Sequence, residues 1–82
     1  MPEFIPIELQ QSAVVLAETL NFSVAAQILG TSLTTLRTQI RQLSTSLECS
    51  LFREDGDSVE VTEEGRVLID AFRHFLAQRR RL

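Results

Sequence analysis

Apolar and polar positions alternate with a helical period through the N-terminal part of the chain. Apolar residues at steps of three and four predict an amphipathic helix over residues 6–20, with Pro6 in its first turn. Asn21 and Ser23 are typical helix N-caps, and Gly30 is typical of the position just past a helix C-terminus. A short second helix is therefore expected between them. Its predicted apolar side consists of Val24, Ala25, Ile28 and Leu29.

Residues 31–47 carry the clearest apolar stripe in the chain. Thr31 or Ser32 is expected to cap a third helix, which should end near Leu47. Apolar side chains recur at steps of 3, 4, 3 and 4, a spacing that buries one helix face. The predicted buried residues are Leu33, Leu36, Ile40, Leu43 and Leu47. The opposite face is polar and shows Thr34, Thr35, Arg37, Thr38, Arg41 and Gln42.

The remaining residues predict a hairpin and a long last helix. The β-like runs 51–53 and 59–61 flank the turn-rich sequence EDGDS. Thr62 can cap a helix of about 20 residues, roughly 30 Å at ~1.5 Å per residue, which runs to the arginines at 79–81. Its predicted apolar stripe consists of Leu68, Ile69, Phe72, Phe75 and Leu76.

This order of elements predicts a mainly α fold, the winged helix-turn-helix: a three-helix bundle, a small β-hairpin wing and a long C-terminal helix. We expect residues 1–82 to form a single domain, with the bundle and wing over 6–61 and the linker helix over 62–82. The alternative is a plain helical bundle in which the hairpin is only a loop. A chain of this size buries only ~60% of its unfolded surface, so its thin core would gain from a partner subunit.

The distribution of charge matters more than its sum. The net charge of -3 argues weakly against a nucleic-acid partner. Residues 31–44, however, contain Arg37 and Arg41 and no acid, whereas residues 45–65 are acidic apart from Arg53. Every basic residue is an arginine, which suits bidentate contacts to phosphates and bases. Positive charge is therefore concentrated on the third and the last helix.

Other kinds of chemistry find little support in the sequence. Cys49 is alone, and one histidine with one distant cysteine cannot form a metal site. The EDGDS stretch lacks the ligand spacing of a calcium loop, and no set of catalytic side chains is evident. No apolar run approaches the ~20 residues of a membrane span, and the N-terminus lacks the basic start of a signal peptide. We therefore expect a cytoplasmic protein that has no enzymatic activity and needs no cofactor, metal or membrane.

A set of short motifs is spaced without a gap from Asn21 to Gly65. The motifs are Asn21-Phe22-Ser23, Ala25-Ala26, Leu29, Ser32, Gln39-Ile40, Leu43, Leu47, Leu51-Phe52, and Val61-Thr62 followed by Gly65. Together they resemble the N-terminal DNA-binding domain of LysR-type transcriptional regulators. The resemblance implies that the third helix enters the major groove and that the wing rests on the flanking minor groove and phosphates. It also implies that the last helix pairs with its counterpart in a second subunit, and that a large effector-binding domain would lie beyond this chain.

The polar face of the third helix is the predicted DNA-reading surface. The candidate DNA-binding residues are Ser32, Thr34, Thr35, Arg37, Thr38 and Arg41, with Arg53 as a further candidate. Arg37 would contact guanine O6 and N7 with its guanidinium fork, and threonine methyl groups would contact thymine. Arg41 or Ser32 would hold a phosphate of double-stranded DNA. The alternative is an ordinary solvated polar face.

The chain departs from the family pattern on this surface. Arg37 stands where the family usually has Ser, and Thr38 stands where it has Arg or Lys. Glu54 and Asp57 stand at basic positions of the family's wing. Carboxylates beside phosphates add repulsion and release no counterions. Three interpretations are open: a solvated turn away from the DNA, a domain that has lost DNA affinity, or compensation by flanking bases.

The outer half of the last helix predicts a homodimer, because Phe75 and Leu76 would otherwise be exposed. The alternative is that this helix folds back onto its own bundle. A dimer would place two recognition helices about one DNA turn apart, roughly 34 Å, and so predicts a palindromic site. The predicted dimerisation residues are Leu68, Phe72, Phe75 and Leu76.

The sequence thus predicts a sequence-specific DNA-binding transcription regulator that acts as a dimer. Two alternatives are a winged-helix protein-interaction module without DNA affinity, and the DNA-binding half of a molybdate-type ligand-sensing regulator. The acidic wing favours the first alternative, and a downstream ligand-binding domain would favour the second.

Overall fold

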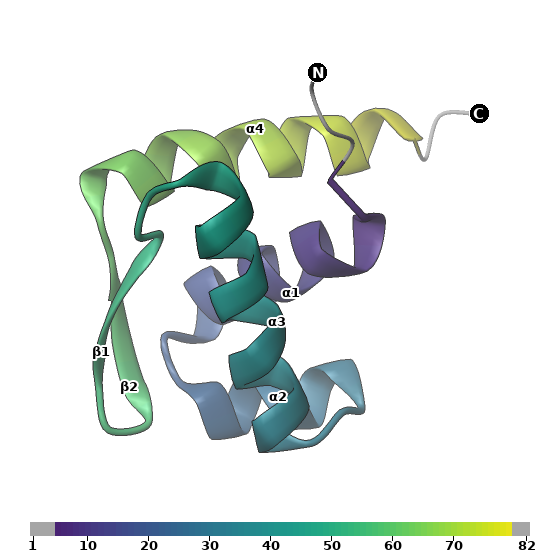
Figure 1. Ribbon diagram of the computed structural model, residues 1–82. Helices are drawn as coiled ribbons and strands as arrows, with labels where there is room; N and C mark the ends of the chain where they lie inside the picture. The colour runs from purple at the N-terminus through teal and green to yellow at the C-terminus, as the bar shows by residue number, and fades with distance from the viewer. Residues whose placement is uncertain (1–4, 80–82) are drawn as a thin grey trace.

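The computed structural model describes residues 5–79, and Figure 1 shows their arrangement. In chain order the elements are α1 (Ile7–Thr19), α2 (Phe22–Leu29), α3 (Leu33–Leu47), β1 (Phe52–Asp55), β2 (Ser58–Val61) and α4 (Glu63–Arg79). Helices α1, α2 and α3 form a bundle, the β1–β2 hairpin stands beside α3, and α4 packs along α1 (Figure 1). The predicted winged helix-turn-helix is confirmed, because the hairpin is a paired sheet and not a loop. Residues 80–82 of the predicted linker helix lie outside the described residues.

Polar side chains cap the helices where the sequence predicts them. Asn21, Ser32 and Thr62 each accept a hydrogen bond from the backbone N–H three residues further on, at 2.9, 3.0 and 2.9 Å. Ser32 rather than Thr31 therefore caps α3, since its oxygen satisfies an N–H group that has no partner within the helix. After α3, Glu48 adopts a left-handed conformation with φ 59°. This conformation costs a residue with a Cβ ~1 kcal/mol relative to glycine.

The hydrophobic core lies between the helices and the base of the hairpin. Leu36, Ile40 and Leu43 are buried as predicted. Leu33 and Leu47, at the two ends of α3, are only half-buried. The largest fully buried side chains are Phe22, Leu16, Leu36, Leu43, Leu51 and Ile69. The core thus draws on α1, α2, α3, α4 and the start of the wing.

The predicted apolar side of α2 is partly wrong. Val24 and Ile28 are exposed, whereas Phe22, Ala25 and Ala26 are buried. Phe22 decides the orientation because it is the largest side chain of the helix and is completely enclosed. Residues two positions apart on a helix face nearly opposite directions, so burial of Phe22 turns Val24 outward.

The wing is a four-residue antiparallel ladder attached at its tip to the bundle. Its register pairs Arg53 with Glu60 and Glu54 with Val59. The backbone N–H of Phe22 donates to the carbonyl of Asp57 at 2.8 Å. The neighbouring N–H of Val59 also donates to the α1–α2 turn. These bonds hold the wing tip against the first turn of α2, so the hairpin does not project freely from the domain.

Gly65 sets the distance between α4 and the base of the wing. A Cβ atom at this position would collide with the backbone carbonyl of Leu51. The N–H of Thr62 donates to that same carbonyl at 3.0 Å, which fixes the start of α4 on the wing. Only glycine permits this approach without moving one of the two elements.

Candidate nucleic-acid interface

Helix α3 brings the predicted DNA-reading residues together on one face. Thr34, Thr38 and Arg41 are exposed on the side of α3 opposite its buried leucines. Ser32 and Thr35 are also exposed, but their hydroxyl groups bond to each other at 2.9 Å at the N-cap. The hydrogen-bonding groups of this face that remain free are therefore those of Thr34, Thr38 and Arg41.

Arg37 is not free, because two carboxylates of the wing hold it. Its Nη1 lies 3.3 Å from Glu54 Oε1, and its Nη2 lies 2.8 Å from Asp57 Oδ1. The guanidinium carbon also lies 4.4 Å from the centre of the Phe22 ring, within the range of a cation–π contact. Only 25% of the Arg37 side chain is exposed. The residue predicted to read guanine is thus engaged within the chain.

Asp57 links the wing to α2 as well as to α3. Its Oδ2 accepts a hydrogen bond from the hydroxyl of Ser23 at 3.0 Å, while Oδ1 faces Arg37. Its backbone carbonyl accepts from Phe22. Sequence reasoning did not identify Ser23 as part of this surface. The contact spans 34 positions of the chain, so no local pattern could have indicated it.

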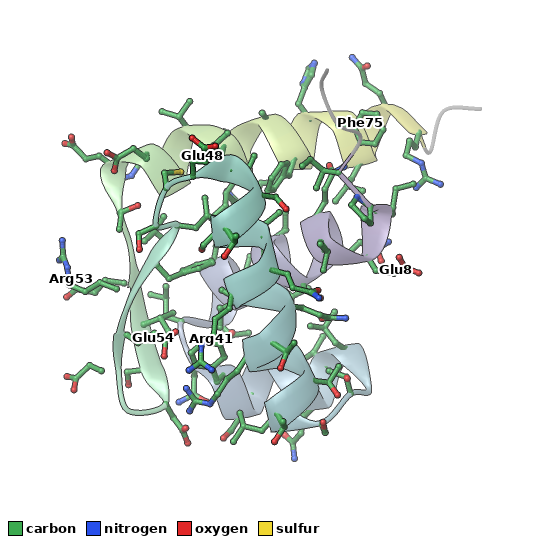
Figure 2. The ribbon with its side chains drawn as sticks, viewed as in Figure 1. Glu8, Arg41, Glu48, Arg53, Glu54 and Phe75 are labelled. Atoms are coloured by element: carbon green, nitrogen blue, oxygen red, sulfur yellow. The ribbon has the colours of Figure 1, made fainter. Side chains whose placement is uncertain are left out.

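Arg53 lies on the opposite face of the hairpin from Glu54, because successive side chains of a strand alternate between faces. Figure 2 shows Arg53 projecting away from α3 and Glu54 lying between the hairpin and α3. Arg53 pairs across the strands with Glu60 at 3.0 Å. Both side chains are more than 70% exposed, so we expect this pair to add ~0–1 kcal/mol. Arg53 therefore does not supply a basic side chain on the face of the wing that lies toward α3, where Glu54 stands.

Arg41 differs from the other two arginines. Among residues 5–79 it forms no ion pair, and its side chain is exposed. Together with Thr38 it lines an open groove that reaches Pro6 and Leu9 at the start of α1. Arg41 is thus the arginine of α3 that is available to an anionic partner.

Helix α4 divides the predicted dimerisation residues between the core and the surface. Phe72 is buried in the chain's own core, and Leu68 and Leu76 are half-buried. Phe75 is 40% exposed. Val67, which sequence reasoning missed, is 69% exposed and lies two turns before Phe75 on the same side of the helix. The apolar surface that α4 offers is therefore centred on Val67 and Phe75.

The remaining candidate groups do not form a site. Cys49 is half-buried with a free thiol, and Gln78 Nε2 lies 3.1 Å from His74 Nε2 on the exposed side of α4. Within the described residues, no three metal-ligating side chains are grouped closely enough to bind an ion. Nor does any helix in that part of the chain have the length and apolar character of a membrane span.

Comparison with known proteins relates the chain to one family of regulators. The family model described as "Bacterial regulatory helix-turn-helix protein, lysR family" matches residues 7–66. No curated protein matches the chain closely enough to count as a relative.

Solved structures share the fold at low sequence identity. The CbnR_DBD–DNA complex superposes with a TM-score of 0.89 at 22% identity, covering 93% of this chain and 87% of that one. The BenM_DBD complex with benA site 1 DNA gives 0.87 at 22% identity, covering 93% and 88%. Oxidized OxyR of Corynebacterium glutamicum gives 0.90 at 24% identity, covering 98% of this chain.

The chain spans about a quarter of that OxyR chain, 26% of its length. The family match extends from the start of α1 into the first turn of α4, and so includes the helix-turn-helix and the whole wing. The chain belongs to the lysR family of bacterial regulatory helix-turn-helix proteins.

Proposed function

We propose that this chain is the DNA-binding part of a transcription regulator and that it binds double-stranded DNA through α3. The family assignment supports this role, and two of the similar structures, those of CbnR_DBD and BenM_DBD, are complexes with DNA. The observation that carries the proposal is the exposed polar face of α3. This is the helix that a helix-turn-helix protein places in the major groove.

The free side chains of this face suggest which residues contact DNA phosphates and which contact bases. Arg41 is the exposed arginine of α3 without a carboxylate partner among residues 5–79, so we assign it a backbone phosphate. Thr34 and Thr38 project their methyl and hydroxyl groups from the same face, and suit contacts to thymine methyl groups and base edges. Ser32 and Thr35 keep α3 capped at its N-terminus, the end of a helix that favours a phosphate.

A homodimer through α4 completes the proposal. The exposed Val67 and Phe75 give this helix an apolar surface that the monomer leaves uncovered. Pairing of two such helices would set the two copies of α3 about one turn of DNA apart, roughly 34 Å, and so would select a palindromic site. We assign the protein no catalytic role.

The direct test is binding of a labelled random-sequence duplex, measured by fluorescence anisotropy at ~50 and ~200 mM salt. We expect a dissociation constant on the order of 10⁻⁶–10⁻⁴ M that rises with salt, because phosphate contacts release counterions. The Arg41→Ala variant should bind about tenfold more weakly and show a salt slope smaller by about one.

The matched control is Arg66→Ala, which removes the same charge from an exposed position of α4. This control should change the dissociation constant less than about twofold, since Arg66 lies outside the reading face. Equal losses in the two variants would contradict the assignment of Arg41. Absence of binding at the lower salt would contradict the proposed function and favour a protein partner.

A further inference from the structure

The ionic cluster between α3, α2 and the wing has the donors of an anion site. Arg37 supplies two guanidinium N–H groups, and Ser23 supplies a hydroxyl from the first turn of α2. The acceptors are the carboxylates of Glu54 and Asp57. Asp57 is bound most closely, since one of its oxygens faces Arg37 at 2.8 Å and the other accepts from Ser23 at 3.0 Å.

The same donor set suits a phosphodiester. Arginine and serine side chains are among the groups with which proteins contact DNA backbone phosphates, and these contacts set the register of the protein on the duplex. Arg37 lies on α3, the helix that the proposed function places in the groove, and Ser23 lies at the adjoining start of α2. A phosphate that approached α3 would therefore meet donors that already hold carboxylates.

The carboxylates are accessible enough to be displaced. The side chains of Glu54 and Asp57 remain 35% and 49% exposed, whereas Arg37 is fixed more deeply against Phe22. Exposed ion pairs contribute little to stability, so a phosphate can compete with these two carboxylates for Arg37. Phe22 is completely buried, so its ring gives the guanidinium of Arg37 a fixed contact at 4.4 Å.

We propose that Arg37 and Ser23 form a phosphate-binding site that the wing carboxylates Glu54 and Asp57 occupy in the free protein. A DNA phosphate and the wing then compete for the same donors, and the acidic wing lowers affinity for DNA by neutralising Arg37. This inference rests on the proposed function, since its ligand is the DNA backbone.

The test measures whether the contribution of Arg37 depends on the wing. Wild type, Arg37→Ala, the pair Glu54→Gln/Asp57→Asn and the triple variant are titrated against the labelled random-sequence duplex. Gln and Asn keep side-chain size and hydrogen-bonding capacity but remove the competing charge. We expect the wing pair to bind about tenfold more tightly than wild type, with a salt slope steeper by about one.

In wild type, Arg37→Ala should weaken binding less than about threefold, because the wing already satisfies this arginine. In the Glu54→Gln/Asp57→Asn background, the same substitution should weaken binding more than about tenfold, because Arg37 then holds a phosphate. Thermal unfolding of each variant, followed by circular dichroism, verifies that all four are folded under the assay conditions.

The matched control is Asp55→Asn/Glu60→Gln, which removes two other negative charges of the hairpin and keeps both partners of Arg37. Because Glu60→Gln also frees Arg53, this background is compared through the cost of Arg37→Ala and not through its own affinity. In this background Arg37→Ala should again cost less than about threefold. An equal cost of Arg37→Ala in all backgrounds, or the same coupling in the control background, would overturn the competition. If neither wild type nor any of the variants binds the duplex, the proposed function fails and the inference fails with it. Binding by wild type that Arg37→Ala abolishes refutes the inference alone.

Discussion

The surface formed by α3 and the wing differs from the outer surface of α4 in whether contacts within the chain already engage its side chains. On the first surface, Arg37 already meets two carboxylates of the wing, so a partner must compete with existing contacts for this arginine. On the second, Val67 and Phe75 remain exposed, and a partner would only have to cover them. Ion pairs within the chain therefore reduce what a partner gains at Arg37, whereas burial of Val67 and Phe75 by a partner removes apolar surface from water and favours association.

The largest expected effect comes from breaking the joint between these two surfaces. Gly65→Ala places a methyl group against the Leu51 carbonyl, where α4 leaves the wing, and should lower the free energy of unfolding by ~3 kcal/mol. The measurement is urea unfolding followed by circular dichroism.

Gly56→Ala is the control for this joint. Gly56 lies at the wing turn with φ 64° and open space around it, so its substitution should cost only ~1 kcal/mol through the left-handed conformation. If the two variants unfold at the same urea concentration, the close approach at Gly65 is not what holds α4 to the wing.

The next effect sharpens the description of α4 as an association surface. Phe75→Glu places a charge in the proposed dimer interface and should weaken the dimer by ~2 kcal/mol or more, about thirtyfold in its dissociation constant. Sedimentation equilibrium measures this change directly. His74→Glu, on the neighbouring exposed position, should leave the dissociation constant within about threefold of wild type. An unchanged mass in Phe75→Glu would show that dimers, if formed, use another surface.

The smallest effect compares the inner and the outer ion pairs of the wing. A double-mutant cycle on unfolding free energy should give a coupling of ~1 kcal/mol for Arg37 and Asp57, because their contact joins separate elements and is only half-exposed. The cycle for Arg53 and Glu60 should give ~0.3 kcal/mol or less, because both side chains are largely in solvent. Equal couplings would show that the inner cluster adds no more than an ordinary surface pair.

Local patterns accounted for most of the fold. The apolar stripe of α3, its Ser32 cap and the Thr62 cap of α4 all depend on residues three or four positions apart. The structure confirms both caps and the burial of Leu36, Ile40 and Leu43. The wing turn was equally predictable, because Gly56 and its polar neighbours interrupt two short β-like runs. The apolar side of α2 could not be predicted in the same way, since Val24 and Phe22 are both apolar and only the shape of the core decides which of them is buried.

The sequence by itself determined which residues lie on the polar face of α3 and where each helix begins, because helix periodicity and capping act over a single turn. Only the tertiary structure decided which arginines of this face are free. Arg37 meets carboxylates 17 and 20 positions away, whereas Arg41, one turn further along α3, makes no ion pair within residues 5–79. The physical reason is that ion pairing depends on distances across the fold, and the wing reaches α3 only after the hairpin has docked on the start of α2.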